Sequence, residues 1–364
     1  NAKAKQLKDA GEPVIHLGGD EPKTLVPESA ITACTNYLQK REVRYSPAGG
    51  IPELKDEIIR YTEHFYGQTG IERQNVIVSG GAKQSIMVAL KALLDPGDEV
   101  IIPVPYWVSY PESKIEAAVT PKTKAIIINS PNNPTGVMYG DDFIRRIVEF
   151  CEDNKIDLIM DDIYHRLVFD NKDIVSCYKY VKNLDCDSRL IVVNGVSKMY
   201  AMTGFRIGWA IANKTLIKVM TNIQGHETSG ASTLSQYAAI GALTGDQTCV
   251  DDLNKLLENN RNVMIEGLNN IKDVHVNRPD GTFYAFVDFS KYEKDSSKLS
   301  KLFLEKIQVV TVPGLDFGME GYLRLSTCGS ESDIREGLRR IKWLLDDDQP
   351  ETIEIGNKII RKHD

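Results

Sequence analysis

The sequence predicts an α/β protein of two domains, the larger built on a mostly parallel sheet flanked by helices and the smaller of α+β type. The length supports two domains, because 364 residues are too many for one ordinary core and few for three. The middle of the chain alternates β-rich apolar runs with segments of helical periodicity, which is typical of parallel strands covered on both faces. The last third changes to long helices separated by several short strands, which predicts the second unit.

The larger domain begins with a β-rich run at 75–79, followed by a glycine pair and a helix at 82–94 in which apolar residues recur at helical spacing. Another helix ends near Asn154, and Asp141 and Asp142 stand where they could cap it. The further strands expected in this domain are 99–103, 125–129, 157–160 and 190–193.

The smaller domain is expected to begin with a helix at 251–269 and to end with one at 331–345, where Ser330 and Asp333 have the spacing of a capping box. Its expected strands lie near 274, 283–288, 309–312 and 322–326. The predicted division is an N-terminal segment at 1–44 that packs with the small domain, a large domain at 45–250, a small domain at 251–348 and a tail of unassigned role at 349–364.

Composition and charge argue against several classes of protein. Hydrophobic residues make up 42% of the chain and charged residues 26%, as in ordinary soluble proteins. The net charge of −7, without a basic cluster, argues against nucleic acid as a partner. No apolar run is long enough to span a bilayer and no leader pattern starts the chain. The six cysteines show neither a CxxC pair nor zinc spacing, so we expect reduced thiols, a cytoplasmic location and no metal.

Four polar motifs follow predicted strands, and ligands bind at the carboxyl ends of strands in an open α/β sheet. Small residues let backbone N–H groups approach an anion, and a carboxylate that ends a buried apolar run is costly unless it is paired. The first three motifs also have plainer interpretations, as a tight turn, an Asn-Pro-Gly turn and a helix cap. The four motifs are 79–83 (SGGAK), 132–136 (NNPTG), 161–164 (DDIY) and 195–208 (GVSKMYAMTGFRIG).

The fourth motif carries the strongest chemical signal. Lys198 follows a buried strand, where loss of solvent lowers the pKa of an amine and makes it nucleophilic. Arg206 follows in the same motif between two glycines, and a guanidinium group is a natural partner for phosphate. The motif therefore indicates a covalent lysine beside a phosphate site.

The run 195–208 resembles the cofactor-lysine signature of the class I and II aminotransferases, a family that uses pyridoxal 5′-phosphate (PLP), and the other three motifs follow in the order of that family. The resemblance extends from about Val14 to Leu345 and is greatest to the bacterial and archaeal branch with aspartate, aromatic and related specificities. It implies the PLP-dependent transferase fold, with a sheet of the seven-stranded type. It also implies transfer of an amino group from an L-amino acid to a 2-oxo acid, with 2-oxoglutarate expected, by a ping-pong mechanism.

The resemblance also implies roles around the cofactor. Lys198 would carry PLP as a Schiff base, Asp161 would keep the pyridine nitrogen protonated, and Tyr164 would complete the catalytic groups. Asn133 and Tyr164 would hydrogen-bond the ring oxygen, and Trp107 would stack on the ring. The expected phosphate ligands are Gly81, Ala82, Lys83, Ser197 and Arg206.

At the substrate end, the resemblance implies that Arg324 grips the α-carboxylate as a bidentate pair, with Gly19 and Asn133 beside the substrate. Tyr45 matches the tyrosine that reaches the phosphate of the neighbouring subunit, which implies a homodimer with shared active sites. The expected partners are therefore a second copy of the chain and small amino and 2-oxo acids. A plainer interpretation of Arg324 is a surface residue on a strand of the small domain.

The chain departs from the family pattern at three places. Few residues separate Tyr110 from Lys114, where relatives have a few tens, so either this loop is deleted or residues are absent from the printed sequence, and the abrupt join favours the second. Asp20 stands where relatives have glycine beside the substrate carboxylate, which an aspartate would repel unless it faces elsewhere or the substrate differs. Gly-Ala follows Ser229 where relatives often have Asn-Pro, which puts its contact with a partner subunit in doubt.

Other reactions remain open on the same scaffold. A β-eliminating C–S lyase or a cyclising lyase is the first alternative, because fold and cofactor do not decide which bond breaks. A PLP-sensing regulator is disfavoured because no helix-turn-helix module is appended. The sequence leaves the preferred amino donor open. It shows no clear basic residue to bind a side-chain carboxylate of the substrate, and Trp107, Phe283 and Tyr284 are compatible with aromatic substrates.

Overall fold

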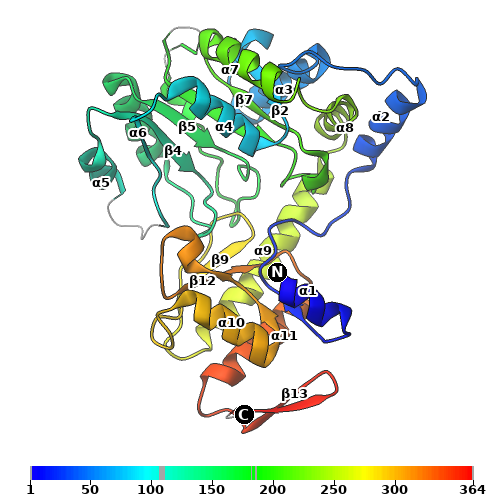
Figure 1. Cartoon of the computed structure of the whole chain (residues 1–364), viewed down its shortest axis with the longest axis vertical. Helices are drawn as coiled ribbons and strands as arrows, with labels where there is room; N and C mark the ends of the chain where they lie inside the picture. The colour runs from blue at the N-terminus through cyan, green and yellow to red at the C-terminus, as the bar shows by residue number, and fades with distance from the viewer. Residues whose placement is uncertain (1, 106–110, 182, 185–186, 363–364) are drawn as a thin grey trace.

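The computed structural model describes residues 2–105, 111–181, 183, 184 and 187–362 (Figure 1). A large sheet with its helices occupies the upper half of Figure 1, and a small sheet with its own helices occupies the lower half. Helix α9 (Thr248–Asn269) runs from one unit to the other. The predicted α/β class, with a mostly parallel sheet flanked by helices and a smaller α+β unit, is confirmed.

The large sheet has the strand order β2-β7-β6-β5-β4-β3. The strands β3 to β6 are parallel to one another, and only β7 is antiparallel to both of its neighbours. Every residue of β2, β6 and β7 is buried, as expected for strands with helices on both faces. The strands are β2 (Val76–Ser79), β3 (Glu99–Ile101), β4 (Thr123–Asn129), β5 (Asp157–Asp161), β6 (Leu190–Gly195) and β7 (Gly208–Ile211).

Alternation along the strands sends side chains to two separate cores. Ile77 packs with helices α4 and α7, whereas its neighbours Val76 and Val78 pack with α3, α6 and α8 on the other face. The helices of the large unit are α3 (Pro52–Tyr66), α4 (Ala82–Leu93), α6 (Asp141–Asn154), α7 (Lys214–Glu227) and α8 (Thr233–Thr244).

The described sheet has six strands, whereas the family resemblance implies seven. β3 ends at Ile101 and its parallel neighbour β4 begins at Thr123, with helix α5 (Pro111–Ala118) between them. A parallel crossover itself needs a dozen or more residues, so this interval has no room for a further strand and a second crossover. This interval contains the short stretch between Tyr110 and Lys114, where relatives are expected to carry a longer loop.

The small sheet is antiparallel, with the order β11-β12-β9-β8. Ser330 caps the last helix by accepting a hydrogen bond from the N–H of Asp333 at 3.1 Å, as its spacing predicts. The predicted cap by Asp141 and Asp142 is wrong: Gly140 is the N-cap of α6, and both aspartates lie in the first turn, where the helix dipole favours negative charge. The elements of this unit are β8 (His275–Val276), β9 (Tyr284–Asp288), α10 (Ser296–Ile307), β11 (Val312–Pro313), β12 (Tyr322–Ser326) and α11 (Glu331–Leu345).

The two ends of the chain pack around these units. β1 (Ile15–His16) pairs in parallel with β10 (Val309–Val310) beside the small sheet, whereas α2 (Glu28–Gln39) packs against α8 of the large unit. The N-terminal segment therefore contacts both units. The tail forms a hairpin whose Ile353 and Ile355 are buried in the small core. The remaining elements are α1 (Ala2–Asp9), the hairpin strands β13 (Thr352–Ile355) and β14 (Lys358–Arg361), and the 3₁₀ helices η1 (Arg73–Asn75), η2 (Cys177–Tyr180), η3 (Thr203–Phe205) and η4 (Gly314–Phe317).

Among the described residues, no helix is both long and apolar enough to cross a membrane.

Candidate active site

A cavity of about 560 Å³ opens at the carboxyl ends of β4, β5 and β6 and is also lined by residues of the small sheet. Asn129 ends β4, Asp161 ends β5 and Lys198 follows β6, so the topology brings three separate segments to one edge. Tyr284 and Arg324 reach the same cavity from β9 and β12. The cavity therefore lies between the two units and needs both.

Lys198 points into this cavity. Its Nζ donates a hydrogen bond to the backbone carbonyl of Asp20 and lies 5.7 Å from the centroid of the Phe283 ring. Burial lowers the pKa of Lys198, although the charges of Asp20 and Glu21 act in the opposite direction. A partly desolvated amine of this kind is suited to nucleophilic attack on a carbonyl group.

Asp161 presents a half-buried carboxylate that has no ion pair with any described residue. Its Oδ1 accepts a hydrogen bond from the N–H of Ile163 at 3.3 Å. Burial raises the pKa of Asp161 to about 6, while the Ile163 N–H and the charge of Lys198 lower it. A protonated ring nitrogen placed against this carboxylate would supply the missing positive charge.

The start of helix α4 forms a cradle for an anion. Gly81, the N-cap, has a φ of +100°, and a Cβ there would lie 2.5 Å from Nη2 of Arg206. Arg206 donates to the carbonyl of Thr203 at 3.0 Å, and it lines the cavity together with Ala82 and Lys83. The first N–H groups of a helix have no intrahelical acceptor, so backbone donors and a guanidinium group converge on one place, as a phosphate requires.

Arg324 provides a second anion site in the cavity. Its Nη1 donates to Oδ1 of Asn133 at 2.9 Å, and its guanidinium lies 4.3 Å from the Tyr284 ring centroid and 5.1 Å from that of Phe317. Its Nε is buried and has no acceptor among the described residues. A buried donor without an acceptor is costly, so a carboxylate bound in a bidentate manner would satisfy it.

Two tyrosines and an amide line the space between Lys198 and Arg324. The hydroxyl groups of Tyr164 and Tyr284 lie 3.4 Å apart, and the N–H of Asn133 donates to Oδ1 of Asn129 at 2.7 Å. Burial holds the pKa of Tyr164 well above its ordinary value, so its hydroxyl remains a hydrogen-bond donor at neutral pH.

Nine of the thirteen predicted site residues line this cavity, and four do not. Gly81 is not part of the lining, although it lies beside Arg206, which is. Gly19 does not line it, and a Cβ there would meet only Oγ of Ser326, at 3.8 Å. Tyr45 is 94% exposed and lies outside the lining. Trp107 falls outside the described residues. The predicted residues that line the cavity are Ala82, Lys83, Asn133, Asp161, Tyr164, Ser197, Lys198, Arg206 and Arg324.

The cavity also contains residues that sequence reasoning did not assign. Asn129 hydrogen-bonds both Asn133 and the Asp161 carbonyl, and its position at the end of an apolar strand was the available signal. Thr203 also lines the cavity, and its hydroxyl donates a hydrogen bond to Glu21 at 2.5 Å. This contact joins distant segments, so no local sequence pattern reveals it. Asp20 lines the cavity, and its charge raises the pKa of Lys198 there, so its departure from the family pattern affects the site directly.

Comparison with known proteins gives a consistent result. The family model for class I and II aminotransferases matches residues 12–113 and 112–341. The aspartate aminotransferase of Streptomyces avermitilis is 39% identical over 382 positions, covering 95% of this chain and 92% of that protein. A probable aspartate/prephenate aminotransferase of Aquifex aeolicus is 36% identical, covering 95% of this chain and 94% of its own.

Solved structures agree with the sequences. A double mutant of Thermus thermophilus aspartate aminotransferase superposes with a TM-score of 0.87 at 32% identity, covering 94% of both chains. The Thermotoga maritima aspartate aminotransferase gives 0.86 at 34% identity and covers the same shares. The two segments of the family match meet at residues 112–113, the place where relatives are expected to carry a longer loop.

Proposed function

Because the chain belongs to the class I and II aminotransferases, we propose that it moves the amino group of an L-amino acid to a 2-oxo acid in this cavity, with PLP as the cofactor and 2-oxoglutarate as the acceptor. The observation that carries the proposal is the convergence of Lys198, Asp161, Arg206 and Arg324 on one cavity. The cradle at Gly81 and the unpaired carboxylate of Asp161 both suit this cofactor.

The residues of the chain would divide the chemistry among them. PLP supplies, when bound, an electron sink for the electrons released at the substrate Cα. Lys198 would attach it covalently and then carry the proton that leaves Cα. Asp161 would hold the proton on the ring nitrogen, and Asn133 and Tyr164 would donate hydrogen bonds to the ring oxygen. Arg206 and the backbone of residues 81–83 would bind the phosphate.

Arg324 and Asn133 would hold the substrate α-carboxylate. The 2.9 Å hydrogen bond between them orients the guanidinium, and the buried Nε offers the second donor of a bidentate pair. Such a grip fixes Cα relative to Lys198 and converts proton transfer into a step between positioned groups.

Aspartate is the first donor to test, since the relatives named above are aspartate aminotransferases. The homodimer is likewise part of the proposal, and a run of exposed apolar side chains supports it. Leu25 is 92% exposed and Tyr45 94%, and Ile31, Leu38 and Val43 are exposed on the same N-terminal segment. The described cysteines are free thiols, which suits the proposed cytoplasmic location.

The proposal is tested by the visible absorbance of the purified protein with PLP, before and after L-glutamate is added without any oxo acid. A bound-cofactor band that converts to the band of the amine form of the cofactor is the expected result. Lys198→Ala should abolish the band. Pyruvate release from cysteine without an acceptor, and no conversion by glutamate or aspartate, would instead establish a lyase.

A further inference from the structure

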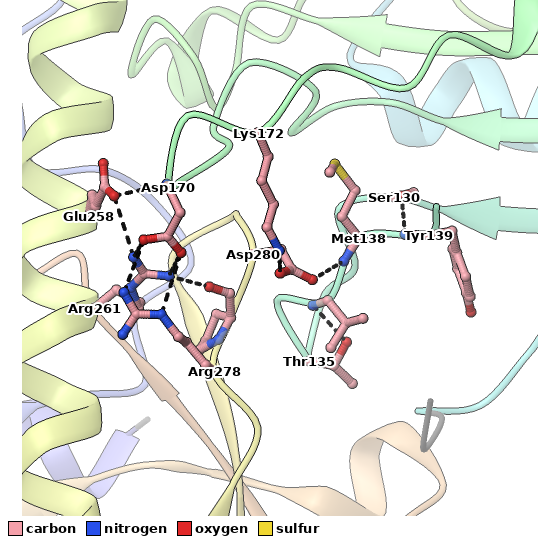
Figure 2. Close-up of polar contacts among 12 residues, drawn as sticks. Ser130, Thr135, Met138, Tyr139, Asp170, Lys172, Glu258, Arg261, Arg278 and Asp280 are labelled. Atoms are coloured by element: carbon pink, nitrogen blue, oxygen red, sulfur yellow. Dashed lines mark hydrogen bonds and ion pairs between the residues drawn. The ribbon is translucent and has the colours of Figure 1, made fainter. Parts of the chain in front are cut away.

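Asp280 lies at the junction of three segments that each present a side chain to the active site. Figure 2 shows its carboxylate between Lys172 and the backbone of Met138. The carboxylate accepts a hydrogen bond from the Met138 N–H at 3.0 Å and pairs with the Lys172 ammonium. Its own N–H donates to the Gly136 carbonyl at 2.8 Å, and its carbonyl accepts from the Phe169 N–H at 2.8 Å.

Each of the three segments leads directly to the cavity. The turn that contains Gly136 and Met138 carries Asn133, and the loop that contains Phe169 follows Tyr164. The segment of Asp280 itself continues into Tyr284 on β9. One residue therefore connects, through its backbone and its carboxylate, the three supports of the polar groups around the cavity.

The contact between two of these segments is close. A Cβ on Gly136 would lie 2.5 Å from Cβ of Pro279 and 2.8 Å from the Tyr284 carbonyl. The N–H of Gly281 also donates to Gly136, at 3.0 Å. The turn consequently has little space in which to move toward Asp280, and a shift of the Met138 N–H would move Asn133 with it.

An ion pair between the buried Arg261 and the partly exposed Asp170 anchors the segment of Asp280. Arg261 on α9, a fully buried side chain, donates two hydrogen bonds of 2.8 and 2.9 Å to Asp170, and it also donates to the Pro279 carbonyl at 2.6 Å. Hydrogen bonds from Arg261 and Arg278 hold the pKa of Asp170 well below its usual range (Figure 2). Asp280 thus extends from a fixed base, so its carboxylate can act as a fixed acceptor.

We propose that Asp280 is a positioning residue: its carboxylate holds the Asn133 turn in the geometry that lets Asn133 and Tyr164 meet the cofactor and lets Asn133 orient Arg324. This inference rests on the proposed function. The acceptor position, rather than the negative charge, is the functional feature. Lys172, whose side chain is 45% exposed, only forms a surface ion pair, and such pairs contribute little.

Two conservative variants separate position from charge. Asp280→Asn removes the charge and keeps the acceptor in place, whereas Asp280→Glu keeps the charge and moves the acceptor by one methylene. Lys172→Met removes the ion pair alone. We expect Asp280→Glu to lose about 10-fold or more in kcat/KM, because a displacement of about 1 Å is costly in a preorganised site. Asp280→Asn and Lys172→Met should stay within about 2-fold of the wild type.

Two readouts besides turnover accompany these variants in the holoenzyme. The pH midpoint of the bound-cofactor absorbance should rise in Asp280→Glu, because weaker donors to the ring oxygen favour the protonated form. The dissociation constant of succinate, a carboxylate that cannot react, should rise with it. Melting temperatures of all three variants show whether a loss is merely unfolding.

The outcomes discriminate clearly. The proposal would be overturned if Asp280→Glu matched the wild type in its pH midpoint and in its affinity for succinate. It would also be overturned if Asp280→Asn and Lys172→Met lost activity equally, because the effect would then come from charge. A wild-type protein without any cofactor band would instead refute the proposed function itself.

Discussion

Burial and the charge of Lys198 shift the pKa of Asp161 in opposite directions, and the net shift affects the stability of the folded protein. Burial raises the pKa of Asp161 to about 6 in the folded protein, above its value of about 4 in the unfolded chain. The folded state therefore binds more protons between these values, and stability is lost as the pH rises from about 4 through about 6. Binding of a cation against the carboxylate would remove the loss.

Asp161→Asn should accordingly stabilise the cofactor-free protein at pH 7.5 by up to about 3 kcal/mol, the equivalent of a shift of about two pKa units. The difference from the wild type should shrink toward zero near pH 4. Thermal unfolding at both pH values measures it, and PLP should then stabilise the wild type more than the variant. A variant that is less stable than the wild type at both pH values would contradict this account.

Asp20 is the second residue whose charge matters. Asp20 lines the cavity, its charge acts on Lys198, and it has no ion pair with any described residue, whereas Glu21 beside it accepts a hydrogen bond from Thr203. A carboxylate in this position repels a second carboxylate on the substrate by about 1 kcal/mol at a separation of several ångströms. Asp20→Asn should therefore lower KM for aspartate and 2-oxoglutarate about 5-fold and leave KM for alanine unchanged.

Steady-state kinetics at low and high salt test this prediction, because screening should shrink the difference between wild type and variant. Glu21→Gln is the matched control, because it removes a neighbouring charge whose carboxylate accepts a hydrogen bond from Thr203. Equal changes for alanine and aspartate would show that Asp20 acts on backbone geometry rather than on side-chain charge.

At the scale of elements, the start of helix α4 is where backbone geometry and ligand chemistry meet. Gly81 has a φ of +100° that other residues rarely adopt, and a Cβ there would displace the Arg206 guanidinium. Gly81→Ala should raise the dissociation constant of PLP about 10-fold or more, since a charge-assisted hydrogen bond to phosphate is lost. Fluorescence titration of the cofactor-free protein measures this constant.

A matched control exists at another helix. Gly140 is the N-cap of α6 with a φ of −71°, and a Cβ there would meet nothing within 4 Å. Gly140→Ala should leave PLP binding unchanged. Unaltered binding in Gly81→Ala would mean that the phosphate does not sit at this helix start.

The elements also show what sequence reasoning can reach. The strands β2, β4, β5, β6 and β12 are predicted within a few residues because their apolar runs are bounded by turn residues or by polar residues at their ends. β7 is not predicted from the sequence. Its first residue, Gly208, is also the last residue of the 195–208 motif, and no turn residues separate the strand from that motif. The strand expected at 309–312 contains β10 and the first residue of β11. β1, of two residues, carries no periodicity and is not predicted, because it forms only by pairing with β10.

The site follows the same rule. Asn133, Asp161 and Lys198 are predictable because each ends or follows a strand of one parallel sheet, and such strands end at one edge. Asp280 and Thr203 are not, because their importance comes from contacts across more than a hundred residues of sequence. No local pattern encodes which loop a distant carboxylate meets.

At the scale of the whole molecule, the stretch of residues 25–45 leaves several large apolar side chains exposed to solvent. It exposes Leu25 and Tyr45 almost fully, and Tyr45 lies outside the cavity of its own chain. A closed two-fold dimer would place this segment against a second copy and give Tyr45 a site to complete there. Light scattering should therefore find a dimer or a multiple of one.

Subunit mixing tests the shared site directly. Lys198→Ala and Tyr45→Ala each damage both sites of their own homodimer. In a mixed dimer, however, one site combines the intact lysine of one subunit with the intact tyrosine of the other. Random exchange of equal amounts yields half mixed dimers with one good site each, so activity should recover to about a quarter of the wild type. If Tyr45 served its own subunit, mixing would restore nothing beyond the average of the two variants. The amount of recovery therefore measures whether the active site belongs to one chain or to two.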